Sequence, residues 1–328
     1  MPSCPILYFV IPCYNEEVVL PITNTLFLDK LTALIAAGEI AEESRILFVD
    51  DGSCDKTWEI ISNLHRQDAH FEGLKLSRNR GHQNALLAGL MTAKQYADVT
   101  VSIDCDGQDD IDAVSRMLHE YKSGAEIVYG VRAARDTDTK FKRNTAKGFY
   151  RLLRFLGAEV VFNHADYRLM SRRALEGLSE FHEVNLFLRG LIPLVGFKSS
   201  SVYYDRRERV AGESHYPLSK MLSLAFNGIT SLSVRPLKMI TGLGFFMSIV
   251  SLLAVIVTVI IKLVGYTVQG WTSLLCVIFL LGGIQIFCLG VIGEYIGKMY
   301  AETKSRPRYI VEEDTLQETK PTEDTAKK

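Results

Sequence analysis

Two long apolar blocks near the C-terminus constrain this 328-residue chain more than any other feature. They run from about Met239 to Ile261 and from Leu263 to Gly293, and Lys262 is the only charged residue between their ends. Each block exceeds the roughly 20 apolar residues that cross a bilayer, and residues 265–271 offer a turn between them. The sequence therefore predicts two antiparallel transmembrane helices. A pair of buried core helices is the alternative.

Basic residues flank these blocks at their outer ends, and the predicted turn carries none. Those before the first block are Lys220, Arg235 and Lys238, and those after the second are Lys298, Lys304, Arg306 and Arg308. Basic flanks stay on the cytoplasmic side, so we expect a multi-pass protein of the cytoplasmic membrane whose two termini and soluble domain all face the cytoplasm. The first residues, Met-Pro-Ser-Cys-Pro, enter a strand pattern with no signal-peptide features.

Residues 1–218 are long enough for one sizeable α/β domain. Short apolar strand patterns alternate there with helical patterns. The expected strands are 6–11, 45–49, 73–76, 99–103 and 126–129, and the expected helices are 15–37, 55–64, 85–94 and 114–121. This alternation predicts a parallel, doubly wound sheet with helices on both faces.

The rest of the chain divides into three shorter parts. In residues 219–238, apolar residues recur near helical spacing beside polar ones, which predicts amphipathic helices at a membrane surface. Residues 239–297 form the predicted transmembrane hairpin. Residues 298–328 are expected to be a cytoplasmic segment that ends, from Glu312 onward, in a polar, disordered tail.

Two carboxylates separated by one residue directly follow the fourth predicted strand. They are Asp104 and Asp106, and the same spacing recurs at 110–112 and 136–138, so spacing alone decides little. Position is more informative, because ligands of open α/β sheets bind outside the carboxyl ends of the strands. Carboxylate oxygens suit Mg²⁺ or Mn²⁺, and such an ion stabilises a departing diphosphate. This pair predicts a metal and nucleotide-sugar site.

Six short motifs occur in a fixed order along residues 6–310. They are Val10–Glu17, Val49–Thr57, Asp104–Gln108, Asp166–Arg173, Gly212–Leu218, and Gly293–Gly297 with Arg306–Tyr309. Together they resemble the polyprenyl-phosphate glycosyltransferases of family 2, the relatives of dolichol-phosphate mannose synthase that include the bactoprenol glucosyltransferases. The resemblance implies a GT-A fold, an α/β fold with a doubly wound, Rossmann-like mixed sheet.

The resemblance implies a role for each donor-side residue. Asp106 and Gln108 would take the metal, and Asp104 would approach both the metal and the ribose. Cys105 would take part through its backbone. The nucleotide would be held by Pro12, Tyr14, Glu16 and Asp51, with Asp51 accepting from uracil N3–H. Helix capping is the alternative for such loop residues, notably Asn15 and Asp55.

Phosphate groups would be bound by arginines. Arg132 and Arg209 are the candidate clamps because guanidinium binds phosphate with two hydrogen bonds, and surface ion pairs are the alternative. The basic stretch 132–154, with Arg143 and Lys147, is a candidate guide for a lipid phosphate. An Arg-Asn-x-Gly block resembles the one beside the family's diphosphate, and its residues are Arg78, Asn79, Gly81, His82 and Asn84.

Two acceptor-side positions leave alternatives open. Asp166 stands where the family places its proposed catalytic base. A phosphomonoester has a second pKa of about 6 and is already largely ionised near pH 7, so Asp166 either accepts a proton or orients the acceptor or Arg168. His215 replaces the family's usual lysine after Gly-Glu-Ser. That change weakens a charge role near neutral pH.

The expected reaction is an inverting transfer of one sugar, glucose or N-acetylglucosamine, from a UDP-sugar to polyprenyl phosphate at the lipid bilayer. Asp106, Arg132 and Asp166 would be the catalytic residues. The family also implies a homotetramer, a flippase and a downstream glycosyltransferase that decorates envelope polymers, and no nucleic acid as partner. The alternatives are a processive polysaccharide synthase, whose Gln-x-x-Arg-Trp motif is missing here, and a non-enzymatic membrane scaffold.

Overall fold

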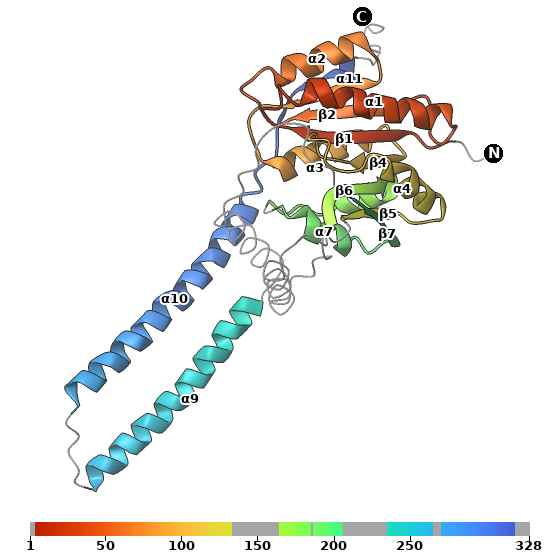
Figure 1. The fold of residues 1–328 in the computed structure, drawn as a ribbon. Helices are drawn as coiled ribbons and strands as arrows, with labels where there is room; N and C mark the ends of the chain where they lie inside the picture. The colour runs from red at the N-terminus through yellow and green to blue at the C-terminus, as the bar shows by residue number, and fades with distance from the viewer. Residues whose placement is uncertain (1–3, 133–163, 185, 206–234, 265–269, 319–328) are drawn as a thin grey trace, which may run out of the picture. The chain divides into compact units, whose positions relative to one another are not determined.

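A computed structural model describes residues 4–132, 164–184, 186–205, 235–264 and 270–318 (Figure 1). The described chain forms two compact units. The first contains residues 4–132 and 164–205 together with 306–318, and the second contains the two long helices that lie between residues 235 and 305.

The first unit is built on one eight-stranded mixed sheet with the order β7-β5-β6-β4-β1-β2-β3-β8. The strands are β1 (Leu7–Cys13), β2 (Arg45–Asp50), β3 (Phe71–Leu76), β4 (Val99–Ser102), β5 (Ile127–Arg132), β6 (His164–Ser171), β7 (Ser199–Tyr204) and β8 (Val311–Asp314). Strand β1 pairs in parallel with β2 and β4, β2 with β3, and β5 with β7. Strand β6 is antiparallel to β4 and β5, and β8 is antiparallel to β3.

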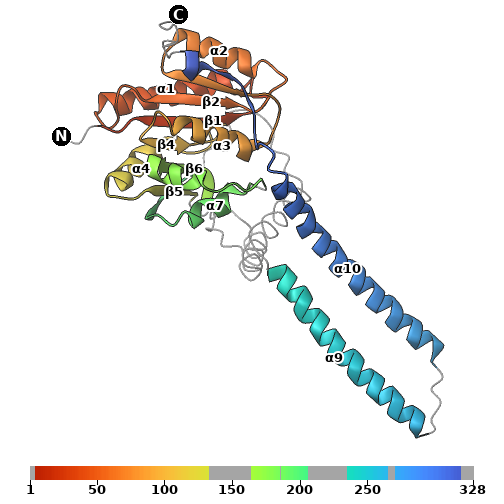
Figure 2. The same ribbon diagram turned by 180° about the vertical axis from the view of Figure 1, so that it is seen from behind.

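Helices cover both faces of this sheet (Figures 1 and 2). They are α1 (Leu20–Ala36), α2 (Thr57–Gln67), α3 (His82–Ala93), α4 (Ala113–Lys122), α6 (Arg172–Ser179), α7 (Leu188–Leu194) and α11 (Thr315–Glu318). On one face, Phe27 of α1 and Met117 of α4 join strand residues such as Phe9 and Phe48 in one buried core. Each such side chain contributes about 1.5–3 kcal/mol by burial.

The opposite face is covered by α3, which packs unusually close to the sheet. A Cβ atom added to Gly89 of α3 would lie 2.5 Å from Val10 and 2.6 Å from Val49, both of which alternate with the core residues along their strands. Because successive strand residues point to opposite faces, α3 must lie on the face opposite to α1 and α4. The predicted doubly wound architecture is thereby confirmed, and the mixed sheet agrees with the GT-A expectation.

Three expectations about individual elements are wrong. The prediction of a purely parallel sheet is wrong, because β6 and β8 run antiparallel to their neighbours. The first helix begins at Leu20, because residues 14–19 form a loop whose N–H groups at Asn15 and Glu17 donate to the loop after β2. The tail is not wholly disordered: β8 extends the sheet at β3, and Leu316 of α11 is buried.

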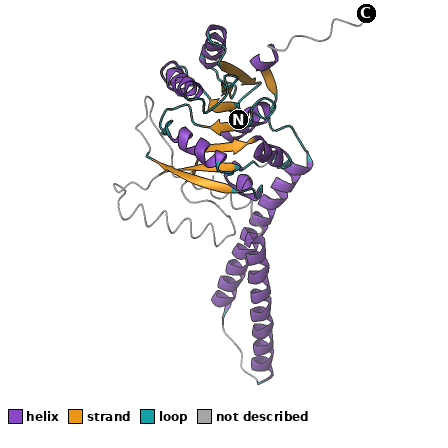
Figure 3. Ribbon diagram, turned by 90° about the vertical axis from the view of Figure 1, so that its right-hand side faces the viewer, coloured by secondary structure: helices purple, strands orange, loops and turns teal. Residues whose placement is uncertain are grey.

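The second unit is a helical hairpin of α9 (Arg235–Leu263) and α10 (Trp271–Thr303), drawn as two long helices in Figure 3. A search of the described residues finds no helix with the length and apolar character that crossing a membrane requires. Residues 235–238, expected to lie in the amphipathic segment, begin α9, and the predicted surface helices at 219–234 lie outside the described residues.

Candidate functional site

The carboxyl ends of β2, β1 and β4 lie side by side. In the parallel register, Cys13 of β1 pairs with Asp50 of β2, and Val10 pairs with Ser102 of β4. The loops that follow these strands begin at Tyr14, Asp51 and Ile103. The structure therefore brings together the predicted nucleotide residues and the Asp104-x-Asp106 turn, as the sequence analysis expected.

The loops after β1 and β2 are tied to each other by backbone-to-side-chain hydrogen bonds. The Asn15 N–H donates to Ser53 Oγ at 2.9 Å, and Asn15 Oδ1 accepts from the Cys54 N–H at 2.9 Å. The Glu17 N–H donates to Asp55 Oδ2 at 3.1 Å. Asn15, at φ 54°, thus fastens one loop to the other and does not cap α1.

Asp55 binds the start of α2 without being its N-cap, which is Lys56 and makes no side-chain cap hydrogen bond. Its Oδ1 accepts from the Thr57 N–H at 3.0 Å and from the Thr57 hydroxyl at 2.6 Å, at the first residue of α2. The Thr57 hydroxyl also accepts from the Glu16 N–H at 2.8 Å. These bonds fix the backbone next to Tyr14, whose side chain is exposed, so an aromatic ring is left accessible to a base or sugar.

Asp51 holds a third loop, the one between β3 and α3. Its Oδ1 accepts from the Arg80 N–H at 2.7 Å and its Oδ2 from the Gly81 N–H at 2.8 Å, although burial raises the pKa of the carboxyl. Next to it, Gly52 adopts φ +66°, and a Cβ there would lie 2.5 Å from the Arg78 carbonyl carbon. Only glycine permits this contact between the two loops. Pairing of Asp51 with uracil stays a prediction.

The turn after β4 presents carboxylates on a tight backbone. Asp106 Oδ1 accepts from the Gln108 N–H at 3.1 Å, and Gly107 has φ +66°. The Cys105 thiol is buried 3.7 Å from Thr23 Oγ1, so this side chain faces α1, and a role for the Cys105 backbone in ligand binding stays a prediction. Burial raises the pKa of the Asp104 carboxyl to about 6. Among the described residues, no group of three or more His, Cys, Asp or Glu side chains is arranged to hold a metal ion.

Asp166 lies at the centre of a cluster of cations. Arg168 Nη2 donates to its Oδ1 at 2.6 Å, and Arg189 Nη2 donates to its Oδ2 at 3.0 Å, with Nε 3.3 Å from Oδ1. His82 Nε2 lies 3.5 Å from Asp166 Oδ2 and 3.7 Å from Asp104 Oδ1. The imidazole at the start of α3 therefore bridges the predicted base on β6 and the acidic turn.

The charges in this cluster shift the ionisation of its members. Burial alone would raise the pKa of the Asp166 carboxyl, but His82, Arg168 and Arg189 outweigh it and hold that pKa well below its usual range. Burial lowers the pKa of the His82 imidazole, and the carboxylates of Asp166 and Asp104 reverse this into a net rise. Asp166 is therefore ionised and weakly basic, which favours the orienting alternative over proton transfer.

Arg132 ends β5 in a second polar group beside the turn. Its Nη2 donates to Asp109 Oδ1 at 3.3 Å and its Nε to the Tyr204 hydroxyl at 3.3 Å, and that hydroxyl donates to Asp109 Oδ1 at 2.6 Å. The anchored guanidinium suits the predicted role in phosphate binding. Sequence reasoning missed Asp109, Tyr204 and Arg189, because no motif marks them and only tertiary contacts reveal them.

Several predicted site residues lie outside the described residues. They are Arg209 and His215, together with Arg143 and Lys147 of the basic stretch and the motif 212–218. Pro12 is described: it lies in β1, in register with Val49.

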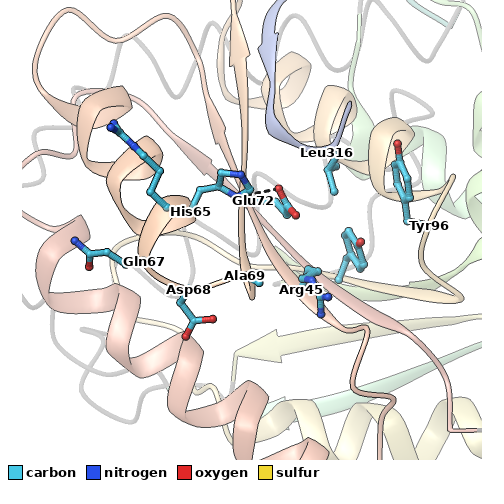
Figure 4. A pocket seen from close by; sticks show the side chains of 10 residues that line it. Arg45, His65, Gln67, Asp68, Ala69, Glu72, Tyr96 and Leu316 are labelled. Carbon is cyan, nitrogen blue, oxygen red and sulfur yellow. Dashed lines mark ion pairs between the residues drawn. The ribbon is translucent and has the colours of Figure 1, made fainter. Parts of the chain in front are cut away.

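A cavity of about 480 Å³ lies at the opposite, amino-terminal edge of the sheet (Figure 4). It is lined by the starts of β1, β2 and β3 and by the end of α2, and there His65 Nδ1 lies 3.3 Å from Glu72 Oε2. The cavity contains none of the predicted site residues. The chemistry is therefore concentrated at the carboxyl edge.

Two family descriptions match this chain. The one described as glycosyl transferase family 2 matches residues 8–179, and the one described as the GtrB C-terminal hairpin matches residues 235–299. The first covers the loops after β1 to β4 and the strand that carries Asp166, but ends before Arg189 and Tyr204, and the second covers most of α9 and α10.

Similar proteins extend over nearly the whole chain. The glycosyltransferase YkoT of Bacillus subtilis (strain 168) is 51% identical over 316 residues, which is 96% of this chain and 94% of that protein. The bactoprenol glucosyl transferase of Shigella phage SfX is 39% identical over 92% of this chain and 97% of its own. A prophage bactoprenol glucosyl transferase homolog of Escherichia coli (strain K12) is 38% identical over the same shares.

The predicted enzyme class and the motif-based resemblance are thereby confirmed. With its acidic turn after β4, its tied nucleotide-side loops and these matches, the chain belongs to glycosyltransferase family 2 and carries a GtrB-type C-terminal hairpin.

Proposed function

We propose that this glycosyltransferase moves a single sugar from a UDP-sugar to a polyprenyl phosphate, with inversion, at the cytoplasmic face of a membrane. The observation that carries the proposal is the Asp104-x-Asp106 turn at the end of β4, linked through His82 to the cations around Asp166. The carboxylates of the turn would bind the metal ion of the UDP-sugar complex. The cations around Asp166 would attract the anionic phosphate of the acceptor. The relatives named bactoprenol glucosyl transferase support the lipid acceptor and favour glucose among the candidate sugars.

The donor side has oxygen ligands that fit a divalent cation. The carboxylates of Asp104 and Asp106 and the side-chain amide of Gln108 form the hard donor set that Mg²⁺ and Mn²⁺ prefer. The raised pKa of Asp104 also fits, since a nearby cation would favour its charged form. When bound, such an ion would offset the charge that develops on the departing UDP.

The acceptor needs little help from a base. A phosphate oxygen of the lipid attacks the anomeric carbon and forms the new C–O bond, while the electron pair of the old C–O bond leaves with UDP. Because the phosphomonoester is largely dianionic near pH 7, Asp166 acts by holding Arg168, Arg189 and His82 in place. Its lowered pKa supports this role.

The membrane part of the proposal rests on the match of residues 235–299 to a GtrB C-terminal hairpin and on the two apolar blocks of the sequence, although no helix of the described residues has the length and apolar character of a membrane span. Helices α9 and α10 would anchor the enzyme beside its lipid substrate, with both termini in the cytoplasm. Membrane crossing, the homotetramer, the flippase and the downstream transferase stay predictions.

The test incubates membranes that contain the full-length protein with undecaprenyl phosphate and a panel of radiolabelled UDP-sugars. We expect label to enter lipid from UDP-glucose or from UDP-N-acetylglucosamine. Asp106→Ala should reduce this transfer by about a hundredfold or more. The comparison variant is Asp112→Ala in the neighbouring Asp-x-Asp pair, where the exposed Asp112 forms an ion pair with Lys30 at 3.0 Å. Unchanged transfer by Asp106→Ala would support the non-enzymatic scaffold.

A further inference from the structure

Arg168 and Arg189 bind the same carboxylate but differ in exposure. Arg168 is fully buried, in register with Ser102 between β6 and β4. The side chain of Arg189, on α7, is 36% exposed. The first arginine is therefore enclosed in the fold, whereas the second can still reach a ligand.

Two of the three guanidinium nitrogens of Arg189, Nε and Nη2, donate hydrogen bonds to Asp166. Nη2 and Nε lie 3.0 and 3.3 Å from the two oxygens of Asp166, so the carboxylate grips one edge of the guanidinium. Nη1 makes no hydrogen bond with any residue that the structure describes. A guanidinium oriented in this way loses little further conformational freedom when it binds an anion.

Arg189 lies on the β6 side of the acidic turn. The loops after β1, β2 and β3 lie on one side of β4 in the sheet, and β6, with Asp166, lies on the other. Arg189 contacts that β6 residue, and His82 stands between Asp166 and the acidic turn. An anion bound by Arg189 would therefore approach the turn from the β6 side, next to His82 and the start of α3, where the Leu188 N–H donates to Gln83 Oε1 at 2.9 Å.

We propose that Arg189 binds the phosphate of the acceptor lipid and that Asp166 positions its guanidinium. This inference rests on the proposed function and specifies its acceptor site. Arg168 and Arg189 place two positive charges against the single carboxylate of Asp166, which suits a phosphomonoester carrying about −1.5 to −2 charges. The fork of the guanidinium also matches two phosphate oxygens.

The test uses the full-length protein in detergent and measures KM separately for each substrate. Arg189→Gln should raise KM for undecaprenyl phosphate by about 10- to 100-fold and change KM for the UDP-sugar by less than about threefold. Arg189→Lys, which keeps the charge without the fork, should give an intermediate rise. A higher KM for the UDP-sugar with an unchanged acceptor KM would overturn the proposal.

Two controls separate folding and function from this role. Arg173→Gln removes an arginine that is 67% exposed and pairs with Glu126 at 3.5 Å, and it should leave both KM values unchanged. Direct titration with geranyl monophosphate, a short soluble prenyl phosphate, should show weaker binding to both Arg189 variants and unchanged binding of UDP. If the wild type binds geranyl monophosphate but transfers no sugar, the proposed function is wrong. The titration still tests whether Arg189 binds the phosphate. Equal affinity of wild type and Arg189→Gln would refute the assignment.

Discussion

The nucleotide-side loops and the Asp166 cluster use polar groups in different ways. In the loops after β1 and β2, side chains mostly bind backbone N–H groups, as Asn15, Asp51 and Asp55 do. Around Asp166, charged side chains bind one another, and the partners come from β6, α7 and α3. The hydrogen bonds to backbone N–H groups fix the shape of the loops. The ion pairs around Asp166 fix the orientation of the charged side chains. We expect substitutions in the two regions to affect different substrates.

The largest effect should follow removal of the carboxylate at the centre of the cluster. Asp166→Ala leaves the fully buried Arg168 without its counter-ion, and we expect a loss of about 3–5 kcal/mol in unfolding free energy. Urea unfolding measures this loss. Asp166→Asn keeps one acceptor oxygen and should cost less. Equal stability of Asp166→Ala and wild type would show that the cluster does not stabilise the fold.

The same pair predicts a dependence on pH. Because the pKa of Asp166 is lower in the folded protein than its unfolded value of about 3.9, its stabilisation is complete above that value. It is lost as the pH falls through the lowered folded pKa. The part of the stability difference between wild type and Asp166→Asn that comes from the carboxylate should therefore shrink below about pH 4. The part that comes from the raised pKa of His82 should fall as the pH rises above about 6.5. A difference that stayed unchanged from pH 5 down to pH 2 would contradict the lowered pKa.

An intermediate effect is expected where two nucleotide-side loops touch. In Gly52→Ala the new Cβ would lie 2.5 Å from Arg78 and 2.6 Å from Asn79 backbone atoms, so the loops must separate. Gly38→Ala is the matched control: its φ is also +66°, but nothing lies within 4 Å. We expect about 1–2 kcal/mol of destabilisation in the control from the left-handed backbone. Gly52→Ala should cost about 1–3 kcal/mol more.

Gly52→Ala should also raise KM for the UDP-sugar and leave the acceptor KM unchanged. Thermal unfolding and steady-state kinetics measure both consequences. If Gly52→Ala and Gly38→Ala had the same stability and the same KM for the UDP-sugar, the close contact between these loops would contribute to neither.

The smallest effect should come from a single loop carboxylate that binds the start of α2. Asp55→Ala removes the acceptor of the Thr57 and Glu17 N–H groups and should cost about 1 kcal/mol, with a modest rise in KM for the UDP-sugar. Asp68→Ala is the comparison at the opposite edge of the sheet, where Asp68 accepts from the His70 N–H at 2.9 Å. It should lose similar stability without a kinetic change. A donor KM raised equally in both variants would mean that general destabilisation, and not the loop, causes the effect.

Elements with a local sequence pattern were predicted well, and elements that depend on contacts between distant parts of the chain were not. The strands up to β5, the helices between them and the acidic turn were predicted nearly at their observed positions, since each rests on a local pattern. Strands β6 and β7 and helices α6 and α7 were not predicted as elements. The ordered β8 was mistaken for a disordered tail, because its polar Val-Glu-Glu-Asp sequence forms a strand only by pairing with the edge of β3.

The sequence alone determined the loops that follow β1, β2 and β4 and the presence of a helical hairpin, because turn residues, apolar period and block length act over short distances along the chain. Tertiary structure alone decided that β6 runs antiparallel beside β4 and that α7 brings Arg189 to Asp166. The physical reason is that ion pairs between separate elements depend on how helices and strands pack. No local pattern records that packing, so the pairing of Arg189 with Asp166 became visible only in the folded chain.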